Sequence, residues 1–267
     1  MTTDAGLGRQ GDVQGPLTAR GIPVDPNLRV MAGATLVNTF GNGALLTTFA
    51  LYFTRMVGLR PTQVGLALSA GALAGPFVQV PAGHVADLRG PRKVLQVLTL
   101  GAGFAILGLL FARSVWVLVT VMAVISAFDR GAGAVRNGYI ARLAEGGQAV
   151  TFKAYLRAMT NVGISFGALF GGIALWVDQG WAYLAVFALD ATTCVVTSGW
   201  LGRLPNLAPV PARQAGEPRL AVLHDVPYVV VTVLSGVAAM HFVVMELAMP
   251  FGSRSTPLRP GRWWRSP

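Results

Sequence analysis

Residues 94–128, VLQVLTLGAGFAILGLLFARSVWVLVTVMAVISAF, decide the fold class of this chain. The stretch is almost wholly apolar. Arg113 and Ser114 divide it into two runs, Val94–Ala112 and Val115 to about Ile140. Each run reaches the length of about 20 residues that a helix needs to cross the hydrocarbon core of a bilayer. Because the connection has only two residues, we expect an antiparallel pair of transmembrane helices.

Five further apolar runs of this length lie along the chain. They cover Val30–Thr54, Thr62–Gly83, Ala154–Val177, Trp181–Gly202 and Tyr228–Pro250. The composition agrees, because 53% of the 267 residues are hydrophobic and only 12% are charged, whereas soluble domains carry about 25% charged residues. The chain is also rich in glycine, with 33 residues. We therefore expect an all-α polytopic membrane protein with seven spanning helices.

The sequence argues against several other classes of protein. The formal net charge is +10, but no basic cluster alternates with aromatic residues as nucleic-acid binding would require. Cys194 is the only cysteine, which excludes a disulfide framework and a Cys-rich metal site. His241 and Glu246 are five residues apart and do not share a helix face well. We expect no metal, no cofactor, no nucleic acid and no enzymatic activity.

The distribution of Lys and Arg predicts the orientation of the chain. Eleven of these residues fall in segments that an inner N-terminus would place inside, whereas only Arg55, Arg60 and Arg113 fall in outer loops. The tail after the seventh run breaks this rule, since it carries four Arg residues and no acid. We interpret that tail as the product of a frameshift or truncation. The expected segments are a disordered cytoplasmic tail (1–28), a six-helix bundle (29–202), a cytoplasmic linker (203–227), a seventh helix (228–250) and the Arg-rich tail (251–267).

The loop between the second and third runs carries the most specific motif, GHVADLRGPRKVL at residues 83–95. Gly90 and Pro91 predict a tight turn. Arg92 and Lys93 follow the turn, where they are expected to anchor the loop at the anionic inner leaflet. A positive-inside turn with no further role is the plain alternative.

This loop resembles the signature of the major facilitator superfamily, G-x-L-A-D-R-x-G-R-K-x-x-L. Arg92 keeps the charge of the family's Lys, whereas Leu88 and Pro91 depart from the pattern. The positions that match in register are Gly83, Ala86, Asp87, Gly90 and Leu95. The resemblance implies the N-terminal six-helix half of such a transporter plus helix seven. It also implies that the loop steadies the contact between the two halves, with Gly83, Asp87, Arg89, Gly90 and Arg92 as the gating residues.

A glycine motif lies on the predicted fifth helix. Glycines four residues apart share a helix face and let a second helix pack closely, which is the simplest reading. The run also resembles the family's antiporter signature, G-x-x-x-G-P-x-x-G-G, with Ala168 in place of Pro, and so implies proton antiport. Its glycines are Gly163, Gly167, Gly171 and Gly172. The same run fits the G-x-S-x-G pattern of hydrolases, which we interpret as a chance match because no strand precedes it.

Charged and polar residues inside apolar runs are the remaining functional candidates, because a charge in a span needs a partner or a wet cavity. Asp129 and Arg130 lie in helix four, and Arg130 resembles the membrane-embedded Arg of a family motif. Anchoring at the helix end is the alternative for both, and we assign Arg136 to that role. The candidates for a substrate path are Asn38, Asn42, Asn161 and Asp190. Hydrogen bonding between helices is the alternative for the asparagines, whereas an unpaired Asp190 would be protonated.

Together these features predict an incomplete secondary transporter in the plasma membrane, with its N-terminus in the cytoplasm. The resemblance implies a proton-coupled efflux permease for small organic compounds. Its partners would be the bilayer, a small-molecule substrate, protons, and either a missing C-terminal half or another membrane protein. The alternative is a non-transporting membrane protein, either a degraded gene product or a partner of another carrier.

Overall fold

The computed structural model describes residues 23, 25–143 and 148–209, together with residues 227, 229–231, 234 and 235. The chain divides into two compact units, Met1–Val210 and Pro211–Pro267. In the second unit, the few described residues are helical. Most of the predicted seventh helix, most of the linker and the whole Arg-rich tail lie outside the described residues, as do residues 1–22.

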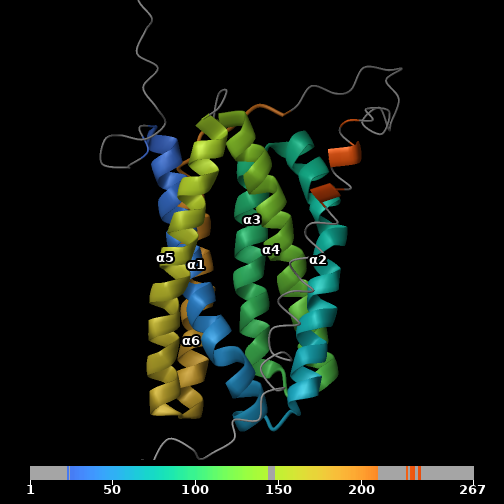
Figure 1. Ribbon diagram of the computed structural model, residues 1–267, viewed down its shortest axis with the longest axis vertical. Helices are drawn as coiled ribbons and strands as arrows, with labels where there is room; N and C mark the ends of the chain where they lie inside the picture. Colours follow the sequence, from blue (N-terminus) through green and yellow to red (C-terminus); the bar gives the residue numbers. More distant parts are fainter. Residues whose placement is uncertain are drawn as a thin grey trace, which may run out of the picture. The chain divides into compact units, whose positions relative to one another are not determined.

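The described part of the first unit forms six long helices (Figure 1). A π-helical turn, Tyr52–Met56, extends the first helix, and a 3-10 turn, Gly108–Phe111, extends the third. The helices are α1 (Pro26–Leu51), α2 (Pro61–Arg89), α3 (Pro91–Leu107), α4 (Val115–Leu143), α5 (Gln148–Val177) and α6 (Gly180–Leu201). Each predicted run of the first six therefore lies on a helix.

The helices begin and end at signals that hydropathy does not detect. Proline occupies the first helical position of α1, α2 and α3, where its missing N–H costs nothing. Asp25 caps α1 by accepting a hydrogen bond from the Asn27 N–H at 2.7 Å. As a result α1 begins at Pro26, four residues before the predicted run. The second helix, α2, continues six residues beyond its own predicted run and ends at Arg89, before Gly90. Hydropathy marks the apolar centre of a span, and the capping residues mark its ends.

Two short connections form as predicted. Only Ala112–Ser114 separate the 3-10 turn after α3 from α4, and α3 packs against α4 along the resulting hairpin. Gly90 alone separates α2 from α3, with a φ of +89° that L side chains rarely adopt. The tight turn expected from Gly90 and Pro91 is therefore confirmed.

The six helices form two groups of three. In one group α1 packs against both α5 and α6, and in the other α4 packs against both α2 and α3. Figure 1 shows α1, α5 and α6 side by side on the left and α2, α3 and α4 on the right. The contact between α3 and α6 joins the two groups. The interior between the groups is therefore bordered by helices from both.

Two apolar clusters close the bundle near its ends. One contains the N-terminal residues of α1 with Tyr139, Ile140 and Phe152, which are at most 1% exposed. The other contains the C-terminal end of α1 with Tyr183 and Phe187, which are fully buried. Between these clusters, polar side chains such as Asn38, Asn42 and Asp190 join the apolar ones that line the interior.

Five of the helices, α2 to α6, are long and apolar enough to cross a bilayer. Although α1 has 26 residues, it is not among these five. The reason is visible in its sequence, where Thr, Asn and Gly residues alternate with apolar ones. Seven apolar runs long enough to cross a bilayer were expected, and α1 is less apolar than α2 to α6 because these Thr, Asn and Gly residues lower its hydropathy.

Candidate functional site

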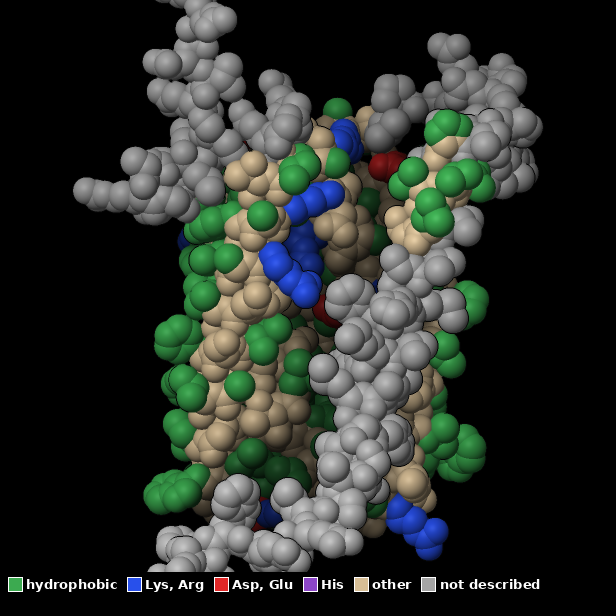
Figure 2. Space-filling model, in the orientation of Figure 1, with side chains coloured by type: hydrophobic (Ala, Val, Ile, Leu, Met, Phe, Trp, Pro, Cys, Tyr) green, Lys and Arg blue, Asp and Glu red, His purple; other side chains and the backbone are tan. Residues whose placement is uncertain are grey.

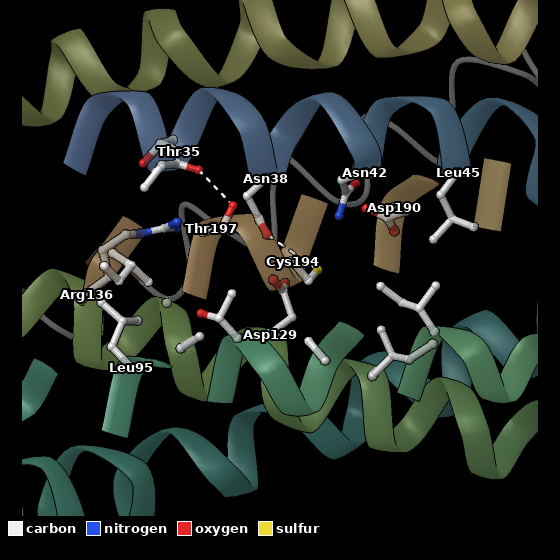
Figure 3. Close-up of a pocket in the computed structure, with 18 of the residues that line it drawn as sticks. Thr35, Asn38, Asn42, Leu45, Leu95, Asp129, Arg136, Asp190, Cys194 and Thr197 are labelled. Atoms are coloured by element: carbon white, nitrogen blue, oxygen red, sulfur yellow. Dashed lines mark hydrogen bonds between the residues drawn. The ribbon is translucent and has the colours of Figure 1, made fainter. Parts of the chain in front are cut away.

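A cavity of about 60 Å³, lined by both polar and apolar residues, lies between α1, α3, α4 and α6 (Figure 3). This volume is enough for a few water molecules. The polar residues that line it are Thr35, Asn38 and Asn42 of α1, Thr99 of α3, Asp129 and Arg136 of α4, and Asp190, Cys194 and Thr197 of α6. We call it the central cavity. It brings together four of the residues predicted from the sequence, namely Asn38, Asn42, Asp129 and Asp190.

Asp190 is the most buried charged residue of this cavity. It is 2% exposed. One carboxyl oxygen accepts a hydrogen bond from the Thr193 hydroxyl at 3.4 Å, and the other has no partner among the described residues. Gly41 makes room for it, because a Cβ at Gly41 would lie 2.9 Å from the Asp190 Cα. The fold thus places a carboxyl group in the interior with one oxygen unpaired among the described residues.

Hydrogen bonds at the cavity wall connect α6 with α1. The Cys194 thiol donates to the side-chain oxygen of Asn38 at 3.6 Å, and the Thr197 hydroxyl donates to the Ala34 carbonyl at 3.4 Å. Asn42 makes no side-chain hydrogen bond within the part of the chain that the structure describes, and in Figure 3 it points into the same space as Asp190. Asn38 therefore bonds between helices, as the alternative interpretation held, and also lines the cavity.

Three of the four charged residues of α4, namely Asp129, Arg130 and Arg136, separate in space. Asp129 lines the central cavity, whereas Arg130 lies on another side of the helix and packs over Gly75 of α2. Neighbouring residues of a helix point about 100° apart, so the two do not share an environment. Arg136 was expected to be an anchor at the inner surface. Instead it lines the central cavity, because it lies two turns from Asp129 on nearly the same face.

A second cavity of about 190 Å³ adjoins the first and shares Thr35 and Arg136 with it. Its other polar residues come from α4 and from the first turns of α5. It is lined by Thr35, Arg136, Asn137, Ile140, Lys153, Leu156, Arg157 and Thr160. We call it the basic cavity. Figure 2 shows Lys and Arg side chains gathered in the upper half of this face of the bundle, with hydrophobic side chains along its sides.

The residues of the loop motif fall into three different environments. Gly83 and Asp87 line a cleft of about 140 Å³ between α2 and α4, close to Arg142. Arg89 is exposed and borders a separate, mostly apolar groove. Gly90 forms the turn described above. The structure therefore brings only Gly83 and Asp87 into one cleft.

Arg92 turns inward. Its guanidinium donates to the Leu204 carbonyl at 2.9 Å and to the Gly202 carbonyl at 3.5 Å. These carbonyls lie just beyond α6, where the last turn of a helix leaves acceptors without partners. Arg92 therefore holds the backbone that follows α6, whereas Lys93 is exposed, and the anchoring of the loop at the membrane surface stays a prediction. The backbone after α6 attracts the guanidinium because it offers unpaired acceptors within reach.

The glycines of α5 form a packing surface. Added Cβ atoms at Gly163, Gly167 and Gly171 would each lie within 2.9 Å of the α1 backbone, whereas Gly172 has nothing within 4 Å. The G-x-S-x-G match lies inside the uninterrupted helix Gln148–Val177, without the strand that a nucleophile elbow needs. Asn161 is exposed and does not line the central cavity. Close helix packing is thus the role that the structure shows for the first three glycines.

Sequence reasoning missed Thr35, Thr99, Cys194 and Thr197. Residues three, four and seven apart share one face of a helix, and this spacing was present. It links Thr35, Asn38 and Asn42 on α1, Asp190, Cys194 and Thr197 on α6, and Asp129 and Arg136 on α4. Small polar residues that repeat at this spacing in an apolar helix could have identified the cavity wall.

Comparison with known proteins agrees with this architecture. Residues 31–255 match the family model described as Major Facilitator Superfamily. A Deinococcus radiodurans protein named "Putative sugar efflux transporter" is 34% identical over 181 residues, which are 63% of this chain and 44% of the relative. The chain thus spans less than half the length of that relative. The six-helix bundle is the N-terminal bundle of the family, and the chain belongs to the Major Facilitator Superfamily, whose members are multi-pass membrane transporters and not enzymes.

Proposed function

We propose that this chain is the N-terminal half, with helix seven, of a proton-coupled efflux transporter for small organic compounds. The central cavity forms one wall of the substrate path, and Asp190 carries the transported proton. The family match and the length of the relative support the larger architecture. The burial of Asp190, with one carboxyl oxygen unpaired among the described residues, is the single observation that supports proton coupling.

Asp190 suits a proton carrier for a physical reason. An ionised carboxylate in a low-dielectric interior is costly unless its oxygens are paired, and one oxygen of Asp190 has no partner in the described residues. A protonated carboxyl group avoids this cost. When the cavity admits water or a polar substrate, ionisation becomes less costly and the proton can leave. Substrate binding and proton release are thereby coupled at one residue.

The chemistry of the cavity wall suits a hydroxylated substrate. Asparagine amides both donate and accept hydrogen bonds, and so do threonine hydroxyls. Asn38, Asn42 and Thr99 offer these groups from two helices. The name of the Deinococcus radiodurans relative refers to sugar efflux, and a sugar carries many hydroxyls. We therefore propose a sugar-like compound as the substrate, exported from the cell.

The orientation follows from the charges at one end of the bundle. Arg89, Lys93, Arg142 and Lys153 lie at the end where α1 begins, α2 ends and α5 begins. We propose that this end faces the cytoplasm and that the membrane is the plasma membrane. The cleft that holds Gly83 and Asp87 lies at the same end. It would contact the C-terminal half during gating, with Arg89, Gly90 and Arg92 supporting the loop and Arg130 steadying α2.

Transport by a longer form of the protein tests this proposal. The form that carries the remaining helices is reconstituted in vesicles with an imposed proton gradient. Protein-dependent substrate flux that follows the gradient is expected. Asp190→Asn should abolish the coupling to protons, because an amide cannot carry the proton.

Asp178→Asn is the matched control. Asp178 lies at the opposite end of the bundle, is partly exposed and has a positive φ of 47°, which asparagine also tolerates. Coupling should persist in this variant. Equal proton coupling in Asp190→Asn and the unchanged protein would contradict the assignment of Asp190.

The second candidate is a membrane protein that does not transport by itself. The 267-residue chain is expected to move no substrate alone, because it forms only one wall of the path. Gradient-driven flux by this chain in vesicles would refute that expectation. Sequencing the gene past codon 267 separates the two candidates. Five further apolar spans in any reading frame support the transporter, and their absence supports the non-transporting protein.

A further inference from the structure

The basic cavity has a charge pattern that the substrate path alone does not require. Arg136, Lys153 and Arg157 border it, and no carboxylate is among the described residues that line it. Among the described residues, none of the three forms a salt bridge, and the ion pair that the described residues do form joins Arg55 and Asp178 at the opposite end of the bundle. Three cations thus border one cavity of about 190 Å³, and none of them has an ion-pair partner in the part of the chain that the structure describes.

Other cations at the same end of the bundle do have partners. Arg92 donates to the Gly202 and Leu204 carbonyls, and Arg142 donates to the Ala208 carbonyl. These two residues hold the backbone that follows α6. Within the described ranges, Arg136, Lys153 and Arg157 make no such hydrogen bonds to backbone carbonyls.

Arg136 and Arg157 lie further from the helix ends than Lys153, although Lys153 and Arg157 are both exposed. Arg136 lies seven residues before the end of α4 at Leu143, and Arg157 lies nine residues after the start of α5 at Gln148. At 1.5 Å per residue these distances are about 10 Å and about 14 Å along the helices. A charge at such depth in a spanning helix is costly unless it faces a wet cavity or a partner. Both residues face the basic cavity.

Hydrogen-bond donors complete the lining. Thr35 and Thr160 supply hydroxyls, and Asn137 supplies an amide. Guanidinium groups bind carboxylates and phosphates through short charge-assisted hydrogen bonds. Asp129, the nearest acid of the central cavity, lies two helical turns from Arg136 and does not line the basic cavity. The field inside the basic cavity therefore favours an anion.

We propose that the basic cavity binds an anionic group, a carboxylate or a phosphate, carried by the transported compound. This inference rests on the proposed function and deepens it, because it assigns the substrate to the organic anions. The shared wall at Thr35 and Arg136 places the anionic group on the cytoplasmic side of the central cavity. The neutral, hydroxylated part of the compound then lies against Asn38 and Asn42.

Binding of inorganic phosphate by the 267-residue chain tests this proposal without requiring transport. The chain is placed in nanodiscs of phosphatidylcholine, and phosphate affinity is measured by calorimetric titration. Arg157→Gln and Lys153→Gln should each weaken phosphate binding about tenfold or more, because each removes a charge-assisted hydrogen bond. Arg157→Lys should recover part of the affinity.

Lys93→Gln is the matched control, since Lys93 is exposed at the same end of the bundle and does not line the basic cavity. It should leave phosphate binding unchanged. Gluconate should compete with phosphate, whereas glucose should not. All variants are first checked for an unchanged thermal unfolding profile, and both Lys153 and Arg157 are exposed enough to be replaced without disturbing the core.

Three results would overturn the proposal. The first is an unmodified chain that binds no phosphate. The second is an equal loss of affinity in Lys93→Gln and Arg157→Gln, which would reveal a diffuse surface effect. The third is loss of phosphate binding when phosphatidylglycerol is added, which would identify a lipid headgroup as the occupant. Because the measurement is of binding, it can fail while proton coupling through Asp190 stands, and the reverse also holds.

Discussion

The two sides of α1 present opposite solutions to packing inside a membrane bundle. On the side toward α5, Gly43 meets the backbone of Ile164, and the glycines of α5 meet the backbone of α1. On the side toward α3, α4 and α6, Asn38 and Asn42 line a cavity. One helix therefore carries a dry contact and a polar wall only a fraction of a turn apart.

The difference shows which side determines the fold and which side is available for function. In lipid, helices associate through close packing of small residues. Moving an apolar helix surface from the lipid tails onto another helix brings no hydrophobic gain, so van der Waals packing must drive the association. The α1–α5 contact is built in this way. A polar cavity contributes little such packing, so its residues are free to serve a substrate. Substitutions on the two sides should accordingly affect different properties.

Gly167→Leu should have the largest effect on the free energy of unfolding. A Cβ at Gly167 would lie 2.9 Å from the Ala44 nitrogen, so the side chain must push α1 and α5 apart. We expect a loss of about 3 kcal/mol or more. Thermal unfolding in detergent, with size-exclusion chromatography, measures it. Gly172→Leu is the control, since nothing lies within 4 Å there, and comparable losses in both variants would remove the distinction.

Arg92→Gln should have the next largest effect on stability. It removes charge-assisted hydrogen bonds to the Leu204 and Gly202 carbonyls, for which we expect a loss of about 2 kcal/mol. Lys93→Gln makes a similar change of charge one residue away, at an exposed position, and should be nearly neutral. The same unfolding measurement applies. If both variants lose equally, the contacts of Arg92 with the end of α6 do not stabilise the fold.

Asn42→Leu should separate function from stability. Asn42 has no side-chain hydrogen bond among the described residues, so its replacement leaves no partner unsatisfied, and we expect a stability change below about 1 kcal/mol. In the longer form of the protein, substrate flux should fall because the cavity loses a polar wall. Flux and unfolding are measured on the same preparation. If Asn42→Leu instead destabilises the fold while the protein that remains folded keeps its full substrate flux, the cavity side of α1 serves stability and not transport.

Arg55→Gln should have the smallest effect. Arg55 pairs with Asp178 at 3.3 Å, but the side chains are 58% and 44% exposed. Solvent screens such a pair, and exposed ion pairs contribute about 0–1 kcal/mol. We expect unfolding to change within that range, with no change in flux. If the free energy of unfolding falls as much as in Arg92→Gln, the Arg55–Asp178 pair stabilises the fold more than its solvent exposure indicates.

The sequence by itself determined that the chain is an all-α membrane protein and located its first six helices. Apolar runs of about 20 residues suffice for this, because a bilayer requires helices of that length. Proline and glycine at the α2–α3 turn also fixed that connection, since φ is set locally. The loop motif and the glycines of α5 indicated the family. Asn38, Asn42, Asp129 and Asp190 were identified because a polar group inside an apolar spanning helix is energetically costly unless it has a partner or faces a cavity.

Only the tertiary structure decided which polar residues share a cavity. Asp129 and Arg130 are adjacent in sequence and lie on different sides of α4, whereas Arg136 joins Asp129 in the central cavity. Arg92 turns toward α6, 110 residues away, and Asn161 remains outside the central cavity. These outcomes depend on how helices rotate and pair, and that is set by packing between distant segments. Local sequence specifies a helix and its polar residues, and contacts with other helices specify what those residues face.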